Sequence, residues 1–188
     1  MNDTEKLRMT VYASLLAALM AVGAYIAIPI GPVPIVLQNL FILLAGLLLG
    51  SKWGLASVGV YLLAGALGLP VFAGGTGGIA RIAGPTGGYL LAFLPAVYLI
   101  GLISERTERH RVIFEIIGMI CGSLVIYAIG VTWLKVVTGM TFSKAVTVGM
   151  LPFLIGDAVK IAAAVPIAMA VRPLINKTSS QVPVTDSV

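Results

Sequence analysis

The fold of this chain is decided by residues 153–161, Phe-Leu-Ile-Gly-Asp-Ala-Val-Lys-Ile, which place Asp157 and Lys160 in a run that is otherwise apolar from Met150 to Val171. At a spacing of three residues on a helix, the two side chains lie on one face. A charged group inside a membrane helix costs roughly 2.5–3.5 kcal/mol, so such groups usually face a protein interior or a wet cavity. The pair therefore indicates a functional site. The alternative is a structural ion pair that joins this helix to its neighbours.

The composition predicts an integral membrane protein with one helical bundle. Of the 188 residues, 59% are hydrophobic and 10% are charged, with a mean hydropathy of +1.07, whereas a soluble domain has about 25% charged residues. Cys121 and His110 are each the sole residue of their type, so the sequence gives no disulfide or metal-ligand cluster, and we expect no cofactor. The basic residues are scattered at the ends of apolar segments, a pattern that fits membrane topology and not nucleic-acid binding.

The apolar runs predict an all-α bundle of six transmembrane helices. Prolines and glycines, or charged turns, separate these runs. The expected helices cover residues 9–30, 35–50, 53–67, 89–104, 112–137 and 150–172. We expect the polar tail at 176–188 to be disordered and cytoplasmic.

The segment at 68–88 is rich in glycine and carries one charge, Arg81. A flexible linker in water would be more polar, so this segment is expected to pack against the bundle over a pocket. Glycines such as Gly74 and Gly75 allow positive φ and a close approach of the backbone to a ligand. No lysine in the chain follows a glycine, so there is no Walker A motif for ATP hydrolysis.

The distribution of cations predicts the orientation. With six spans, eight lysines and arginines fall on the side of both termini and three on the other side, so the positive-inside rule places both termini in the cytoplasm. The proline-rich turn, the glycine-rich segment and the 138–149 loop then lie together outside. An outward-facing pocket is the expected result.

The polar residues near this pocket suit a small amphipathic ligand with a carboxylate and an amide-like ring. Lys160 can pair with a carboxylate, Asp157 can accept N–H groups, and Gln38 and Asn39 can do both. Apolar walls are expected from Tyr89, Phe93, Phe72 and Phe153. Two other functions stay open at this point. A solitary ion-coupled carrier would usually show an internal repeat, and a membrane enzyme would need more acid, base or nucleophile groups than one pair.

A stripe of small residues runs along the first helix at Ala13, Ala17 and Ala21. Such stripes let helix backbones approach closely. The contact is either internal to this bundle or made with a partner protein.

Four stretches resemble the BioY family, the biotin-specific substrate-binding component of energy-coupling factor transporters. They are Gly31-Pro-Val-Pro-Ile-Val-Leu-Gln38, Gly68-Leu-Pro-Val-Phe-Ala-Gly-Gly-Thr-Gly-Gly78, Gly84-Pro-Thr-Gly-Gly-Tyr89 and Gly156-Asp-Ala-Val-Lys160. Their order matches over about residues 9–173, although Val36 stands where a threonine is expected. The resemblance implies a subunit in the bacterial cell membrane that captures biotin from outside with high affinity.

The resemblance also implies partners and roles. The chain would assemble with a transmembrane coupling subunit and two cytoplasmic ATPases, with Ala13 and Ala17 as the docking surface. Asp157, Asn39 and Gln38 would bind the ureido ring, with help from the glycine-rich backbone. Lys160 would serve the ureido carbonyl or the carboxylate, and its place one turn from Asp157 favours the ureido end. Arg81 is a candidate for the carboxylate, or else an ordinary loop cation.

Overall fold

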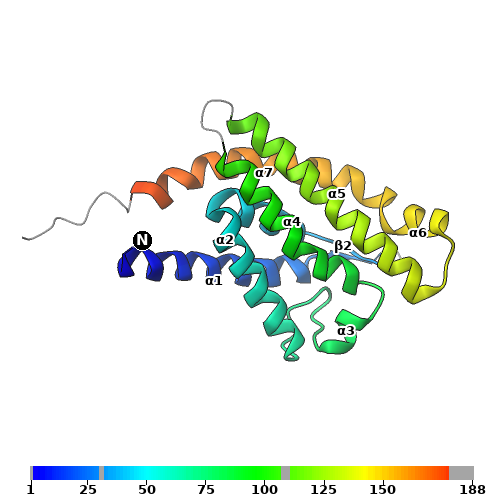
Figure 1. The fold of residues 1–188 in the computed structure, drawn as a ribbon. Coiled ribbons are helices and arrows are strands. Elements are labelled where there is room, and N and C mark those ends of the chain that lie inside the picture. The colour runs from blue at the N-terminus through cyan, green and yellow to red at the C-terminus, as the bar shows by residue number, and fades with distance from the viewer. Residues whose placement is uncertain (1, 30–31, 107–110, 178–188) are drawn as a thin grey trace, which may run out of the picture.

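The protein is a bundle of long helices, seen here in a computed structural model that describes residues 2–29, 32–106 and 111–177 (Figure 1). Two short strands and two short helices connect the long ones. The elements are α1 (Asp3–Tyr25), β1 (Ala27–Ile28), β2 (Ile35–Val36), α2 (Gln38–Ala66), α3 (Ile79–Ala83), α4 (Gly87–Glu105), α5 (Arg111–Thr138), α6 (Phe142–Gly149) and α7 (Leu151–Lys177).

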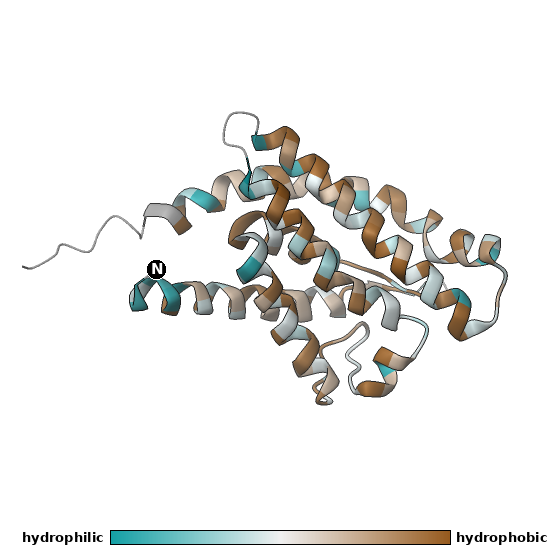
Figure 2. Ribbon diagram, in the orientation of Figure 1, coloured by the Kyte–Doolittle hydropathy of each residue, from teal (hydrophilic) through white to brown (hydrophobic). Residues whose placement is uncertain are grey.

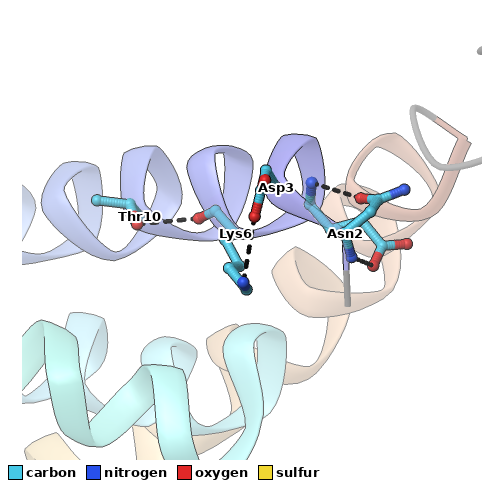
Figure 3. Close-up of polar contacts among 5 residues, drawn as sticks. Asn2, Asp3, Lys6 and Thr10 are labelled. Atoms are coloured by element: carbon cyan, nitrogen blue, oxygen red, sulfur yellow. Dashed lines mark hydrogen bonds and ion pairs between the residues drawn. The ribbon is translucent and has the colours of Figure 1, made fainter.

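Helix α1 begins six residues before the expected start at residue 9 because a capping box precedes it. The Asn2 side chain accepts a hydrogen bond from the Glu5 backbone N–H at 2.9 Å, and the Glu5 carboxylate accepts one from the Asn2 N–H at 3.2 Å. Figure 3 shows this cap together with the Lys6–Asp3 ion pair at 3.2 Å. The reciprocal cap satisfies two of the free N–H groups at the helix start, so polar residues extend the helix beyond the apolar run.

The expected helical continuation to residue 30 is wrong. Helix α1 ends at Tyr25, and β1 pairs antiparallel with β2, Ala27 opposite Val36 and Ile28 opposite Ile35. Ile28 precedes Pro29, and Val33 precedes Pro34; a residue before proline is disfavoured in the α region and adopts extended backbone. The same ribbon delays the start of α2 from the expected residue 35 to Gln38.

Helix α2 contains a sharp reversal at Gly50, which has φ +74° and ψ −171°. Only glycine fits there: a Cβ at Gly50 would lie 2.1 Å from Glu105 Oε1. The Glu105 carboxylate instead accepts a hydrogen bond from the Ser51 backbone N–H at 2.7 Å, and so caps the second half of the helix. The break expected between the helices at 35–50 and 53–67 thus lies at Gly50, and α2 makes two passes.

The C-terminal third contains two helices that meet at Met150. The segment between the helices expected at 112–137 and 150–172 contains a short helix, α6. Helix α7 continues to Lys177, so residues 176 and 177 are helical and not part of a disordered tail. The rest of the expected tail lies outside the described residues.

The long helices run back and forth between two ends of the molecule (Figure 1). We call the end where α1 begins and α7 ends the terminal end, and the opposite end, with the β ribbon, α3 and α6, the loop end. Within the described residues, five helices are long and apolar enough to cross a membrane, and the reversal in α2 provides the sixth pass. Brown hydrophobic residues dominate these helices (Figure 2). The predicted all-helical membrane bundle is confirmed.

The alanine stripe of α1 faces the interior of this bundle. Ala13 and Ala17 are 4% and 7% exposed and belong to the main hydrophobic core. The Ser57 hydroxyl of α2 donates a hydrogen bond to the Ala13 carbonyl at 2.8 Å. Of the two alternatives, internal packing is the one that the structure shows, because small side chains let α1 approach α2 closely. The assignment of Ala13 and Ala17 to a docking surface stays a prediction, for a surface that α2 covers in this chain alone.

Candidate ligand-binding site

A cavity of about 380 Å³ opens at the loop end. Its wall is built from the β ribbon and the start of α2, the segment between α2 and α4, and the ends of α4, α5 and α7 that meet there. Its size lies in the range of small-molecule sites, which are mostly apolar with a few placed polar groups. The polar or charged side chains in its lining are Gln38, Asn39, Thr76, Arg81, Thr86, Tyr89 and Tyr127.

The amides expected in the site lie at the first turn of α2. Gln38 is 2% exposed and lines the cavity, and its Nε2 has no hydrogen-bond partner among the described residues. A buried donor without a partner costs about 1–3 kcal/mol. Asn39 is half-buried and lines the same cavity. Both amides thus lie in the cavity wall, although Gln38 Nε2 itself is covered and lies near the Tyr61 hydroxyl.

The glycine-rich segment contributes backbone to the cavity wall. Phe72 and Thr76 form a tight bridge, with the Phe72 N–H donating to the Thr76 carbonyl at 2.8 Å. Gly74 and Gly75 lie in its turn with φ of +71° and +69°, a conformation that favours glycine. Gly74 lines the cavity, but Gly75 does not; a Cβ there would lie 2.9 Å from the Tyr25 ring.

Arg81 lies in α3, exposed, and its side chain forms part of the cavity lining. The end of the same segment is attached to α5, because the Trp133 indole N–H donates to the Gly84 carbonyl at 2.9 Å. The segment at 68–88 is also attached to α1 and its C-cap region. The Gly74 N–H donates to the Ala24 carbonyl at 3.2 Å, and the Tyr25 hydroxyl donates to the Pro70 carbonyl at 2.6 Å.

The aromatic side chains that were expected as walls are all in the lining: Phe72, Tyr89, Phe93 and Phe153. Phe72 contacts the Tyr61 ring edge to face at 5.6 Å and approaches Gly65 so closely that a Cβ there would lie 2.0 Å from its ring. The Tyr89 hydroxyl donates to the Gly149 carbonyl at 2.8 Å, which joins α4 to the end of α6. These walls suit the apolar part of a ligand.

The acid and base of the opening stretch form a buried pair on α7. Lys160 Nζ lies 3.1 Å from Asp157 Oδ1, and each residue is 8% exposed. Neither residue is in the cavity lining. The Tyr127 hydroxyl connects them to it, because it donates a hydrogen bond to Asp157 Oδ2 and Tyr127 itself lines the cavity.

Tyr127 was missed by the sequence analysis. It lies within an apolar run on α5, 30 residues from Asp157. The neighbouring sequence does not distinguish Tyr127 from other residues of the apolar run. A buried tyrosine hydroxyl usually has a hydrogen-bond partner, but that rule does not identify Asp157 as the partner.

Comparison with known proteins identifies the family of this chain. A family model described as the BioY family matches residues 1–177. The chain belongs to the BioY family. Two relatives illustrate the similarity. A protein of Pyrococcus horikoshii named probable biotin transporter BioY is 49% identical over 155 residues, which is 82% of this chain and 90% of the relative. The biotin transporter BioY of Thermotoga maritima is 40% identical over 168 residues, 89% of this chain and 98% of the relative.

A solved structure has the same fold. It is the crystal structure of the S-component for biotin from an ECF-type ABC transporter, with a TM-score of 0.86 and 34% identity over 92% of this chain and 95% of that chain. The resemblance to BioY proteins that four short motifs indicated is thereby confirmed, and so is the fold class. Membership also makes this chain a multi-pass membrane protein of a transport family and not an enzyme.

Proposed function

We propose that this BioY-family chain is the high-affinity biotin-binding subunit, or S-component, of an energy-coupling factor transporter for vitamin uptake. The observation that carries the proposal is the cavity at the loop end, in a chain of this family. It combines a buried amide, aromatic walls, a tyrosine bonded to a buried acid–base pair, and an arginine. Biotin has a polar ureido ring for the amide and the tyrosine, an apolar thiophane for the aromatic walls, and a carboxylate for Arg81.

In this proposal the ureido ring lies at the deep end of the cavity. Asp157 acts on the ureido ring through Tyr127, whose hydroxyl it holds in the cavity wall, and Gln38 Nε2 donates to the ureido carbonyl, with Asn39 close by. Lys160 Nζ, 3.1 Å from Asp157 Oδ1, holds the carboxylate in position for this contact. Arg81 at the mouth binds the valerate carboxylate, and the backbone at Gly74 covers the ligand.

The proposed orientation places the terminal end in the cytoplasm. Described cations at the terminal end are Lys6, Arg8, Lys52, Arg106, Arg111 and Arg172, and those at the loop end are Arg81, Lys135 and Lys144. An excess of lysine and arginine marks the cytoplasmic side. The cavity then opens to the outside, where an uptake protein meets its substrate.

The proposed partners are a transmembrane coupling subunit and two cytoplasmic ATPases. Since Ala13 and Ala17 are buried, the coupling subunit would contact the opposite face of α1. On that face the side chains of Val11, Leu15 and Val22 are 55–57% exposed. They form an apolar surface that the other described helices leave uncovered.

Calorimetric titration of biotin into the detergent-solubilised protein from biotin-starved cells tests the ligand. We expect one-to-one binding that Asp157→Asn weakens by about a hundredfold, since the variant loses a charge-assisted bond of about 1.5–3 kcal/mol and leaves Lys160 without its counter-charge. Glu105→Gln, a carboxylate variant at the far end of the bundle, is the matched control and should bind as the unmodified protein does. No heat with biotin in the folded protein would contradict the proposal.

Uptake assays distinguish the proposed subunit from a solitary carrier. Biotin uptake in cells should require the ATPase subunits and should persist when the ion gradients are collapsed while ATP is maintained. Uptake by this chain alone that collapses with an ion gradient would identify the carrier instead.

A further inference from the structure

A second hollow lies on the outside of the bundle, between α5 and α7. It has a volume of about 500 Å³ and is lined by aliphatic side chains, among them Ile116 and Ile120 of α5 and Ala158, Ile161, Ala162 and Val165 of α7. Ala158 and Ala162 are exposed. Their small side chains, opposite two isoleucines, leave a groove in the membrane-spanning surface that no described residue fills.

The groove leads toward a cluster of charges at the terminal end. Arg172 lies seven residues after Val165, which is two helical turns on the same face of α7. Its guanidinium hydrogen-bonds Glu115 Oε1, to which Arg111 Nε also donates, at 3.1 Å. Two arginines thus share one carboxylate, so the cluster carries a net positive charge. The Arg111 side chain is 38% exposed and can reach a further anion.

The distances along the helices match one leaflet of a membrane. Val165 lies about 10 Å and Ala158 about 21 Å from Arg172 along α7, and Ile116 lies about 8 Å beyond Arg111 along α5, at 1.5 Å per residue. The hydrocarbon core of a bilayer is about 30 Å thick, or about 15 Å per leaflet. The groove therefore lies at acyl-chain depth, and the two arginines lie at headgroup depth of the leaflet nearest the terminal end.

We propose that this groove binds one acyl chain of an anionic phospholipid, whose phosphate lies at Arg111, the exposed arginine of the cluster. The apolar lining suits the acyl chain of the lipid. The net positive charge of the arginine cluster favours an anionic headgroup over a zwitterionic one. The site lies on the outer face of α7, whereas Asp157 and Lys160 are buried on its inner face. The proposal does not depend on the identity of the transported ligand.

Native mass spectrometry of the full chain with equimolar phosphatidylglycerol and phosphatidylcholine tests it. We expect one phosphatidylglycerol to be retained preferentially. Ala162→Phe fills the groove and should remove this adduct, whereas Ala128→Phe, an exposed alanine of α5 outside the groove, should leave it. Arg111→Gln should lower the preference about fivefold, equivalent to about 1 kcal/mol for one juxtamembrane arginine, and Lys52→Gln on α2 should not.

Biotin affinity, measured on the same variants, serves as the folding control and should be unchanged. Equal retention of the two lipids, or retention of phosphatidylglycerol by a folded Ala162→Phe variant, would overturn the proposal. So would loss of coupling-subunit assembly in Ala162→Phe with lipid retention unchanged, because the groove would then be a protein interface.

Discussion

The two ends of the bundle use buried polar groups differently. At the terminal end they bind one another across helices. Glu115 on α5 is fully buried, and its Oε1 accepts from Arg111 and from Arg172 of α7, whose guanidinium also donates to the Leu47 carbonyl of α2 at 3.2 Å. Glu105 of α4 caps the second half of α2. These contacts join four helices at one level of the membrane.

At the loop end the polar groups face a cavity. Gln38 has a buried N–H without a partner among the described residues, and Arg81 and Asn39 line the same space. Glu115 Oε2 is also without a partner there, but Glu115 is in the lining of neither hollow. The two groups therefore differ in their surroundings, because Gln38 belongs to the residues that line a cavity and Glu115 does not. The Asp157–Lys160 pair is intermediate, because it is satisfied internally and reaches the cavity through Tyr127.

Removing the charge of Glu115 should give the largest effect on stability. Glu115→Gln keeps the shape but leaves Arg172 buried without a counter-charge, which costs about 3 kcal/mol. For a chain of this size that lowers Tm by about 10 °C. Thermal unfolding in detergent, followed by intrinsic fluorescence, measures it.

Glu105→Gln is the informative counterpart, because its partners are the uncharged Ser51 N–H and hydroxyl. We expect a loss of about 1 kcal/mol or less. Equal losses for the two variants would show that the arginine cluster does not hold the terminal end together. Biotin affinity of the folded fraction should change in neither.

Much of this architecture could be predicted from the sequence, because long apolar runs and their breaks specify membrane helices without reference to neighbours. The rotation of each helix about its own axis, which decides the residues that face a neighbour, could not be predicted. The period of small residues in α1 gave a stripe but not what it faces, and the structure turns Ala13 and Ala17 toward α2. The β ribbon was missed because a charge-free, proline-rich connection looks like an irregular turn, although Pro29 and Pro34 favour extended residues before them.

The site could be predicted where a residue is unusual for its surroundings. Gln38, Asn39 and Arg81 are polar in apolar segments, and all three line the cavity. Asp157 and Lys160 were as conspicuous, but they were expected in direct reach of the ligand and lie behind Tyr127. A tyrosine in a membrane helix is common, so its pairing across 30 residues depends on packing that no local pattern contains.

Replacing the amide of Gln38 should separate stability from binding. Gln38→Leu removes a buried donor that has no partner, so Tm should stay the same or rise. Biotin affinity should fall by about tenfold, the equivalent of one lost hydrogen bond of about 1.4 kcal/mol. Calorimetric titration and thermal unfolding of the same sample check both. A lower Tm with unchanged affinity would assign this amide to the packing of the bundle.

The smallest effect on biotin affinity should come from Tyr127, and this variant tests most directly how the buried pair relates to the cavity. Tyr127→Phe keeps the ring in the cavity wall and removes the hydroxyl that donates to Asp157 Oδ2. Because Asp157 keeps its bond to Lys160, we expect biotin affinity to fall by about fivefold, near 1 kcal/mol for one hydrogen bond. Tyr98→Phe, at an exposed tyrosine of α4, is the matched control and should bind normally.

Combining Tyr127→Phe with Asp157→Asn tests whether Tyr127 acts on the ligand through Asp157. If it does, the effect of Tyr127→Phe disappears in the double variant, since the effects of residues in one network are not additive. An undiminished effect of Tyr127→Phe in the Asp157→Asn background would instead mean that the hydroxyl contacts the ligand independently, and the buried pair would then belong with the structural ion pairs of the terminal end.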